Sequence, residues 1–414
     1  MAEQSTGLRL TDPDLMECPY PHYKRSFDAG ERVVTDPDVG VAVLGYKEII
    51  EVAKNPKDYS SELSERPFHM GISGEPIQDD VMAILGELPD VRNALFGVDP
   101  PAHTRHRTVL SQALNPRQLR KLEPQVQQVA EDLVAAFLDR GEVDLHPEFA
   151  ILLPLTVICD ILGVRRDDMM LFKSWGEEML AGNSHVLDHQ RRLEVARALV
   201  DFHKYFEPLI EERRVAPTQD LLSWLVNAKV DGEAALTNAE LGVIASQILL
   251  AGQETTTNLI GNALVILCER QDLQSRLRAN PSDIPKFIEE VLRWDPPVHC
   301  TVRRATREVE FHGQTAAKDQ WVLPMWAAGN RDPIMFPGPD ELDIDRPNAR
   351  KHLAFGHGIH ACVGAELARM EGRIAIELLL SKTRDWVIDE ERSDLTHLPT
   401  FAQHGYNKVV LTFA

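Results

Sequence analysis

Apolar residues recur at the spacing of a helix face through the middle of the chain. They fall every three or four positions in the segments 117–140, 187–214 and 237–270, which predicts three long helices. Thr237 and Glu240 have the spacing of a capping box, so the third helix has a marked start. At a rise of 1.5 Å per residue this helix would be about 45 Å long and would cross the whole molecule.

Shorter β-branched runs flank the helical region. They predict strands at 33–34, 41–44, 298–322 and 408–413, the third of these with turns at 312–313 and 318–319. A short helix is expected over 46–54, and a last helix just after Cys362. Glycine and proline are frequent over 66–100 and 327–361, which predicts a long, poorly ordered loop and an irregular meander.

The chain has 414 residues, of which 43% are hydrophobic and 26% charged, as in ordinary globular proteins. No internal repeat or low-complexity segment divides it. We therefore expect a single, mainly helical domain with a smaller β part over residues 1–414. It would comprise a β-richer region over about 1–65, a helix-rich region over about 100–295 and a region with strands and the cysteine loop over about 296–414.

The charge balance is acidic, because 44 basic and 64 acidic residues give a net charge of −20. This argues against binding to nucleic acid or to an anionic membrane, both of which need basic surface. Residues 1–19 have no apolar signal-peptide core, and no run of 18 apolar residues occurs. The five cysteines are widely spaced, which fits a reducing compartment. We expect a cytoplasmic monomer with no membrane or nucleic-acid partner.

Cys362 differs from the other cysteines in its neighbours. It follows the residues Phe-Gly-His-Gly-Ile-His-Ala of 355–361, and a helix is expected from Val363 onward. The two preceding glycines suit a tight turn that approaches something flat, and Gly364 lets the chain pass close to whatever the sulfur binds. Unpaired amides and the helix dipole favour a negative charge at this end, so a thiolate is predicted.

Two other interpretations of this segment remain open. Cys362 could be an ordinary buried thiol beside a glycine-rich turn. Alternatively, His357, His360 and Cys362 could bind zinc, although no convincing fourth ligand with normal spacing is present.

The long helix contains polar residues where its surroundings are apolar. Near its middle it reads Ala-Gly-Gln-Glu-Thr-Thr over 251–256. The alanine and glycine leave room for a flat ligand. A threonine hydroxyl that bonds to a carbonyl one turn earlier can bend the helix, and an acid beside it can relay protons. The alternative is a solvated acid and a packing threonine on a surface helix.

The cysteine segment resembles the haem-binding loop of the cytochrome P-450 family. Residues 355–364 match the pattern F-G-x-G-x-H-x-C-x-G at every fixed position. The resemblance implies that Cys362 is the axial ligand of the iron in haem b. It also implies that Phe355 packs beside the sulfur, that His360 reaches a haem propionate, and that Gly356 and Gly364 shape the loop. A thiolate ligand donates electron density that promotes O–O cleavage.

Residues 251–255 resemble the A-G-x-[DE]-T motif in the distal helix of that family. The resemblance implies that Ala251 and Gly252 face the haem. It implies further that Glu254 and Thr255 deliver protons to dioxygen.

Other segments resemble the family's haem clamps. Residues 99–107 resemble D-P-P-x-H-T-R-x-R, which implies that His103 and Arg107 grip propionates. Arg303 resembles a further propionate arginine. Arg304 is the alternative, and strand alternation does not easily let both point inward.

A salt-bridge frame is implied in the same way. Glu290 and Arg293 resemble the family's E-x-x-R, and Arg346 resembles the third member of that buried triad. The motifs occur in family order along nearly the whole chain. The resemblance therefore implies the cytochrome P-450 fold, a triangular, helix-rich domain with a long central distal helix and a cysteine-ligand loop.

The implied function is that of a haem-thiolate monooxygenase, which inserts one oxygen atom of O2 into a C–H bond of a small, mostly apolar substrate. No flavin or iron–sulfur motif is visible, so electrons from NAD(P)H are expected through a separate ferredoxin and its reductase. The same fold could instead perform C–C or C–N coupling, desaturation or peroxide-driven chemistry. A non-enzymatic haem sensor is a remote alternative. The intact acid–alcohol pair favours oxygen activation.

The resemblance also suggests where substrate and ferredoxin would bind. Pocket positions would come from the 66–98 loop and from Gln247, Leu250, Ala251, His299, Thr301 and Gln403. Gln247 or His299 could bind a hydroxyl or carbonyl group, and either could equally face away. Candidate cations for an acidic ferredoxin are Arg105, Lys351, Arg369 and Arg373.

Overall fold

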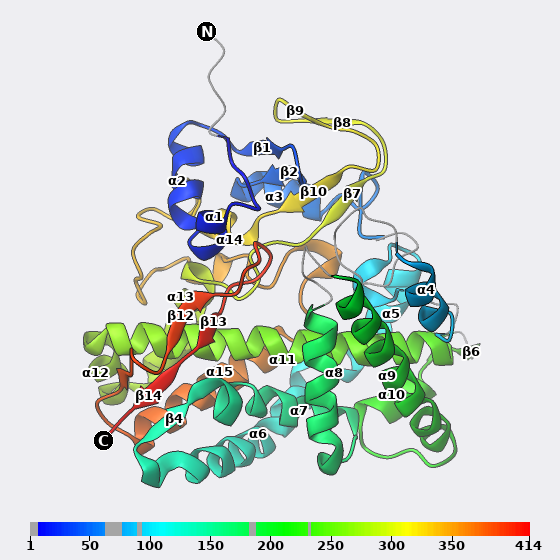
Figure 1. Ribbon diagram of the computed structural model, residues 1–414. Coiled ribbons are helices and arrows are strands. Elements are labelled where there is room, and N and C mark those ends of the chain that lie inside the picture. The colour runs from blue at the N-terminus through cyan, green and yellow to red at the C-terminus, as the bar shows by residue number, and fades with distance from the viewer. Residues whose placement is uncertain (1–6, 63–76, 89–92, 182–187, 231–232) are drawn as a thin grey trace. The chain divides into compact units, whose positions relative to one another are not determined.

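The computed structural model describes the chain except for residues 1–6, 63–76, 89–92, 182–187 and 231–232 (Figure 1). The chain forms two compact units, each made from separate stretches of sequence. Unit 1 comprises Met1–Ser60, Glu123–Leu153 and Thr255–Ala414, and unit 2 comprises Ser61–Leu122 and Pro154–Glu254. The cysteine loop lies in unit 1, so this unit is described first.

Unit 1 contains a five-stranded sheet whose strands come from the two ends of the chain (Figure 1). Its order is β1 (Val33–Asp36), β2 (Gly40–Val43), β10 (Trp321–Pro324), β7 (Arg303–Ala305) and β3 (Tyr59–Ser60). β2 and β10 run parallel, and the other pairs are antiparallel. Every residue of β2 is buried, as expected of a central strand rich in valine. The predicted strands near 33–34 and 41–44 are confirmed.

Smaller sheets complete the β part. They are β4 (Glu142–Asp144) with β14 (Val410–Thr412) and β11 (Val387–Ile388), β8 (Val309–Phe311) with β9 (Gln314–Ala316), β12 (Asp394–His397) with β13 (Tyr406–Lys408), and, in unit 2, β5 (Lys229–Val230) with β6 (Glu233–Ala234). The predicted turn between β8 and β9 is confirmed, because His312 and Gly313 both have positive φ, of 48° and 80°. This is the conformation that a two-residue hairpin needs.

Helices hold far more residues than strands in both units, so the predicted class, mainly α with a smaller β part, is confirmed. Unit 1 holds α1 (Pro13–Glu17), α2 (Tyr20–Asp28), α3 (Tyr46–Ala53), α12 (Gln271–Ala279), α13 (Ile284–Trp294), α14 (Trp326–Asn330) and α15 (Ala365–Lys382). Unit 2 holds α4 (Asp79–Leu85), α5 (Ala102–Ala113), α8 (Met169–Ala181), α9 (His189–Val215) and α10 (Leu221–Asn227). The chain passes between the units within α6 (Pro116–Phe137), α7 (Leu152–Leu162) and α11 (Asn238–Glu269).

The three long helices predicted from periodicity correspond to α6, α9 and α11. The start of α11 confirms the capping box. The amide of Thr237 donates to Glu240 Oε2 at 2.8 Å, and the amide of Glu240 donates to Thr237 Oγ1 at 3.2 Å. The helix then continues for 32 residues (Figure 1).

The prediction of an unbroken loop over 66–100 was wrong in the part that the structure describes. α4 lies within it, and so does a short 3-10 turn at Leu95–Gly97. Asp79 and Asp80 occupy the first turn of α4, where negative charge favours a helix start. Val81 and Leu85 are four apart and buried on one face. Residues 63–76 and 89–92 of the predicted loop lie outside the described residues.

Each unit has its own apolar core. In unit 1, β1, β2, β7 and β10 pack against α3 through buried valines and isoleucines. In unit 2, aromatic rings of α8 and α9 interlock edge to face, with Phe172 at the centre, 5.3 Å from Trp175 and 5.8 Å from Phe202. None of the helices in the described ranges is both long and apolar enough to cross a membrane.

Candidate active site

The cysteine loop of unit 1 is a tight, half-buried turn that ends at a helix N-terminus. Gly356 and Gly358 adopt positive φ of 67° and 75°. A side chain at Gly358 would also meet the carbonyl oxygen of Ala53 at 2.3 Å, so only glycine fits. The amide of Cys362 donates to the carbonyl of Phe355 at 2.8 Å, which closes the loop. Cys362 is exposed just before α15, where the helix dipole favours a thiolate.

A buried acid from α13 holds this loop in place. Glu289 accepts hydrogen bonds from Arg369 at 2.6 Å and from His352 at 3.1 Å. The guanidinium of Arg369 lies 4.5 Å above the ring of Phe355. Burial alone would raise the pKa of Glu289, but the bonds from His352 and Arg369 outweigh it and lower its pKa to about 2. Glu289 was not predicted from the sequence, because the family motif marks only its neighbour Glu290.

That neighbour, Glu290, forms the predicted salt-bridge triad. Its carboxylate accepts from Arg293 at 2.7 Å and from Arg346 at 3.1 Å. Neither Glu290 nor Arg293 is exposed to any measurable extent. The two guanidinium groups also donate to backbone carbonyls of the meander, at Asn330, Pro337, Gly338, Pro339 and Glu341. The triad thus ties the meander to α13.

The middle of α11 is accessible where the rest of the helix is buried. Residues 241–250 and 256–267 are all buried. Between them Ala251 is exposed, and Gly252, Glu254 and Thr255 are partly exposed. These four residues of the predicted motif are thus the accessible ones in the middle of α11. Ala251 to Glu254 belong to unit 2, and Thr255 belongs to unit 1.

A buried carboxyl group that sequence reasoning missed lies next to this motif. Glu371 of α15 is 2% exposed and hydrogen-bonds to Thr256 of α11. Burial raises the pKa of Glu371 to about 8, more than the bond from Thr256 lowers it. Glu371 is therefore a protonated acid at neutral pH, one residue from Thr255. An acid at the seventh residue of a helix gives no sequence signal of its own.

In unit 2, α5 presents the predicted clamp residues on one face. His103 is buried, and Arg107, one turn later, is partly exposed. The neighbouring Arg105 is an ion-pair partner of Glu240 at 2.5 Å, and His106 Nε2 lies 3.0 Å from the same carboxylate. Glu240 of the capping box therefore also joins the start of α11 to α5.

The strand β7 separates the two candidate propionate arginines as the alternation predicts. Arg303 is 7% exposed, whereas the side chain of Arg304 is 33% exposed and pairs with Asp319 at 2.5 Å. Arg303 is thus the inward residue of the two.

The suggested substrate-pocket residues lie in both units. Gln247 and Leu250 are buried on α11 in unit 2, and neither amide atom of Gln247 bonds to a described residue. His299, Thr301 and Gln403 lie in unit 1, where Val298 and Gln403 form an antiparallel bridge. His299 is not available to a substrate in the way that Gln247 is, because its ring lies 3.4 Å from the hydroxyl of Tyr20 within a buried network.

The zinc alternative at the cysteine loop finds no support. Among the described residues, one group of His, Cys, Asp and Glu has ligand atoms close enough to share a metal ion, and it is Asp295, His299 and His404. His357, His360 and Cys362 do not form such a group.

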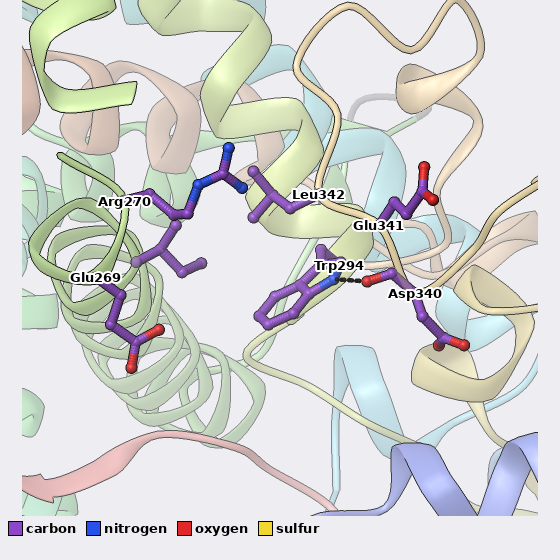
Figure 2. A pocket seen from close by; sticks show the side chains of 7 residues that line it. Glu269, Arg270, Trp294, Asp340, Glu341 and Leu342 are labelled. Carbon is purple, nitrogen blue, oxygen red and sulfur yellow. Dashed lines mark hydrogen bonds between the residues drawn. The ribbon is translucent and has the colours of Figure 1, made fainter. Parts of the chain in front are cut away.

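A surface cavity of about 470 Å³ in unit 1 lies apart from these residues (Figure 2). It is lined by Ile266, Glu269, Arg270, Trp294, Asp340, Glu341 and Leu342, and the indole of Trp294 donates to the carbonyl of Asp340 at 2.8 Å. It contains none of the predicted site residues.

Three of the four candidate docking cations already have acidic partners within the chain. Arg105 pairs with Glu240 as described. Arg369 pairs with Glu289 and Glu366, and Arg373 pairs with Glu123 and Glu377. Lys351 is exposed in the short turn Ala349–Lys351 that precedes the cysteine loop.

Comparisons with known proteins agree with this geometry. The family model described as Cytochrome P450 matches residues 73–407. The chain is 37% identical over 310 residues to 6-deoxyerythronolide B hydroxylase of Saccharopolyspora erythraea, covering 74% of this chain and 75% of that protein. It is 35% identical over 316 residues to vitamin D(3) 25-hydroxylase of Pseudonocardia autotrophica, covering 76% of each. The solved structure of cytochrome P450 CYP109Q5 from Chondromyces apiculatus has a TM-score of 0.85 at 31% identity and covers 99% of both chains.

Proposed function

Because the chain belongs to the cytochrome P450 family and is therefore a haem-thiolate monooxygenase, we propose that it hydroxylates a large, mostly apolar molecule with electrons from a separate ferredoxin. The observation that carries this proposal is the exposed Cys362 on a closed glycine turn at the start of α15. When bound, haem supplies the activation of O2 for insertion into a C–H bond.

The residues present in unit 1 fit a haem. An exposed sulfur at a helix N-terminus is a suitable anionic ligand for iron, and Phe355, which we assign to pack beside it, has its ring under the guanidinium of Arg369. A side chain at Gly364 would come within 3.9 Å of the sulfur, so glycine keeps the approach open. Arg303 and His360 in unit 1, and His103 and Arg107 in unit 2, are the residues that we assign to the propionates.

Glu254 and Thr255 are the residues that we assign to proton delivery. Both are partly exposed in the one accessible stretch of α11. Thr255 would hold a proton on its hydroxyl at the ligand face, and Glu254 would replace it from solvent. Glu371 hydrogen-bonds to Thr256, the residue after Thr255, and its carboxyl group remains largely protonated at neutral pH.

The relatives' names give the proposed substrate class. They are called hydroxylases of 6-deoxyerythronolide B and of vitamin D(3), both large and mostly apolar molecules. In this chain Gln247 is 1% exposed, and its amide makes no hydrogen bond to a described residue. Leaving a buried amide unbonded is costly, so we assign it to a hydroxyl or carbonyl group of the substrate.

The proposed source of electrons is a separate protein, because no flavin or iron–sulfur motif is visible in the sequence. We propose a ferredoxin that receives electrons from NAD(P)H through its own reductase. Its docking face would include Lys351 and the adjacent Arg350, whose side chain is 78% exposed and lies 4.0 Å from Glu289, at the limit of an ion pair. Arg369 and Arg373 contribute less than expected from sequence, because their charges are neutralised by acids of the chain.

A carbon monoxide difference spectrum of the reduced protein tests the proposal. The wild-type protein should show the red-shifted Soret band of a thiolate-ligated haem. Cys362→His should lose this band, and Cys268→Ser, which changes a half-buried thiol elsewhere in unit 1, should keep it. A band at the shorter wavelength of histidine-ligated haem in the wild type, or no haem at all, would refute the assignment of Cys362.

A further inference from the structure

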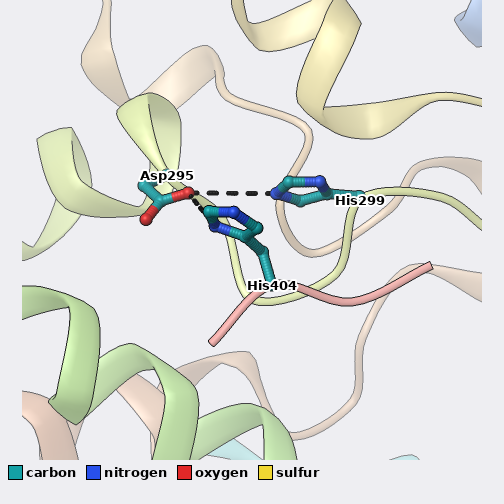
Figure 3. Close-up of side chains that lie close together, drawn as sticks. All are labelled: Asp295, His299 and His404. Atoms are coloured by element: carbon teal, nitrogen blue, oxygen red, sulfur yellow. Dashed lines mark hydrogen bonds and ion pairs between the residues drawn. The ribbon is translucent and has the colours of Figure 1, made fainter. Parts of the chain in front are cut away.

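A buried cluster of ionisable side chains lies in unit 1, outside the residues assigned above. Asp295 follows the last residue of α13, and two histidines direct ring nitrogens at one of its oxygens (Figure 3). His404 Nδ1 lies 2.7 Å from Asp295 Oδ1, and His299 Nε2 lies 3.9 Å from it. The hydroxyl of Tyr20 donates to the same oxygen at 2.5 Å. All three residues of the cluster are at most 3% exposed.

The ring of His404 is stacked between two other imidazoles. The ring of His299 lies 4.5 Å away at 21°, and the ring of His397 lies 3.8 Å away at 14° on β12. His397 in turn pairs with Glu17 at 3.0 Å. The cluster therefore connects α1, α2, the end of α13 and the C-terminal hairpin.

The distances indicate a shared proton rather than a metal ion. Zinc bonds nitrogen and oxygen at about 2.0–2.1 Å, so two ligands of one tetrahedral ion lie roughly 3.3 Å apart. The pair Asp295–His404 is much closer, at 2.7 Å, and the pair Asp295–His299 is wider, at 3.9 Å. A separation of 2.7 Å is that of a charge-assisted N–H···O hydrogen bond.

The charges of the cluster follow from these contacts. Burial alone would lower the pKa of His404, but the charge and hydrogen bond of Asp295 outweigh it and raise that pKa. Burial and the charge of His404 lower the pKa of His299 to about 4. Burial alone would raise the pKa of Asp295, but His404 and His299 hold it well below its usual range. These contacts favour a protonated His404 paired with an ionised Asp295, beside a neutral His299.

This ion pair joins two segments that are also paired through their backbones. The amide of His299 donates to the carbonyl of Ala402 at 2.8 Å, and the amide of His404 donates to the carbonyl of Pro297 at 3.0 Å. Between these bonds lies the bridge from Val298 to Gln403. The segments 298–301 and 401–403 contain Thr301 and Gln403, two of the positions suggested for the substrate pocket.

Residues that flank the two segments, Asp295 and Gly405, pack on α11 just after Thr255. A side chain at Gly405 would meet the amide oxygen of Asn258 at 2.3 Å, so the turn after His404 packs directly on the helix. Asn262, one turn further on, donates to the carbonyl of Asp295 at 3.3 Å. A shift of the ion pair would therefore move the pocket segments relative to Thr255.

We propose that the buried pair Asp295–His404 is a positioning device that locks the segments 298–301 and 401–403 together and so determines which large ligands fit above the haem. Neither residue touches the substrate. The inference rests on the proposed function, since it takes these segments as part of the pocket. A ligand that only coordinates the iron would not sense the pair, whereas one that fills the pocket would.

The test compares two azoles that bind haem iron through nitrogen. 4-Phenylimidazole fills space beside the iron, and imidazole does not, so the ratio of their dissociation constants reports pocket shape. In His404→Gln the affinity for 4-phenylimidazole should fall by about fivefold or more relative to imidazole. His404→Arg, which keeps the charge, should restore the ratio. His397→Gln is the matched control, because it removes the outer ring of the stack but no bond to Asp295.

The ratio should also depend on pH in the wild type. Because the pKa of His404 is raised, the ion pair is present below that pKa and is lost as the pH rises through it. As the pH rises above neutrality, wild-type affinity for 4-phenylimidazole should fall relative to imidazole when both dissociation constants are expressed for the neutral azole, and His404→Arg should show no such fall. The ionisable groups that face His404 are Asp295, His299, His397, Glu17, Tyr20 and Tyr406, with Arg331 packed on Tyr20.

The outcomes separate this inference from the proposed function. A thiolate band with carbon monoxide in every variant leaves the proposed function intact. With that band present, an unchanged ratio in His404→Gln, or an equal loss for both azoles, overturns the positioning role. One equivalent of tightly bound zinc per chain, lost in His404→Gln, would overturn it as well and make the cluster a metal site.

Discussion

The protonated Glu371 gives the prediction with the best-defined magnitude. Glu371→Gln replaces a buried carboxylic acid with an amide of nearly the same shape, which no longer titrates. Glu371 is 2% exposed on α15, and burial raises its pKa from 4.5 to about 8. The substitution therefore removes the charge that the wild type must acquire in its interior at alkaline pH, while the contact with Thr256 keeps a polar partner.

The sign and size follow from proton linkage. Between pH 4.5 and pH 8 the folded protein keeps a proton on Glu371 that the unfolded chain has lost. The stabilisation from that proton is fully present below the unfolded pKa and is lost as the pH rises through the folded pKa. Between these two pKa values, each pH unit lowers the free energy of unfolding by about 1.4 kcal/mol. From about pH 5 to about pH 8, Glu371→Gln should gain up to about 4 kcal/mol relative to the wild type.

Urea unfolding followed by far-UV circular dichroism measures this difference at each pH, with the slope m checked for constancy. Glu377→Gln is the control, because Glu377 lies on the same helix but its side chain is 34% exposed and stays hydrated. Its unfolding free energy should follow that of the wild type. If the free energies of unfolding of the wild type and of Glu371→Gln change with pH in parallel, Glu371 is not a buried neutral acid. The proposal that it provides a protonated carboxyl group beside the motif of α11 would then be refuted.

Three further outcomes are expected. Thr255→Ala should keep haem and ligand binding but divert electrons to hydrogen peroxide, measured as peroxide per NAD(P)H consumed with a surrogate ferredoxin system; normal coupling would remove Thr255 from proton delivery. Arg293→Met should lower the free energy of unfolding by about 3–5 kcal/mol, because it removes one partner of a buried ion pair, whereas Arg270→Met at an exposed pair should cost less than about 1 kcal/mol. Lys351→Glu should slow reduction by an acidic ferredoxin at low salt, and an effect that persists at high salt would point to a non-electrostatic cause.

Local patterns accounted for the parts of the structure that depend on nearby residues. The long helices follow from apolar periodicity, and the capping box needs only Thr237 and Glu240, three positions apart. The turn before Cys362 depends on Gly356 and Gly358, which both adopt positive φ, and a side chain at Gly358 would also meet the carbonyl oxygen of Ala53. In each case the determining residues lie within a few positions of the feature.

Features that depend on distant partners could not be predicted in this way. The helix α4 was missed because glycines and prolines around it outweigh its single apolar stripe. Glu240 was seen only as a cap, although Arg105 and His106, more than 130 positions away, also bind it. Glu371 resembles any helical acid until the packing of α11 shows that it is buried.

The buried acids of α13 explain why so many distant contacts converge in unit 1. Glu289, Glu290 and Asp295 lie within seven positions at the C-terminal end of this helix and its cap, and each is buried. Glu289 holds the cysteine loop through His352 and Arg369, while Glu290 holds the meander.

Asp295 holds the pocket turn, so one short helix fixes the register of three segments that haem chemistry needs together. Buried ion pairs add little net stability over apolar packing, but removing one partner leaves a charge without compensation. If one of these segments shifted relative to α13, it would lose its ion pair with the buried acid. Apolar packing tolerates small shifts, so apolar contacts alone would not fix the position of the segment. The need for one fixed position therefore favours carboxylates over leucines at the three positions. Replacing one of the three acids should accordingly disturb first the segment that it binds: the cysteine loop for Glu289, the meander for Glu290 and the pocket turn for Asp295.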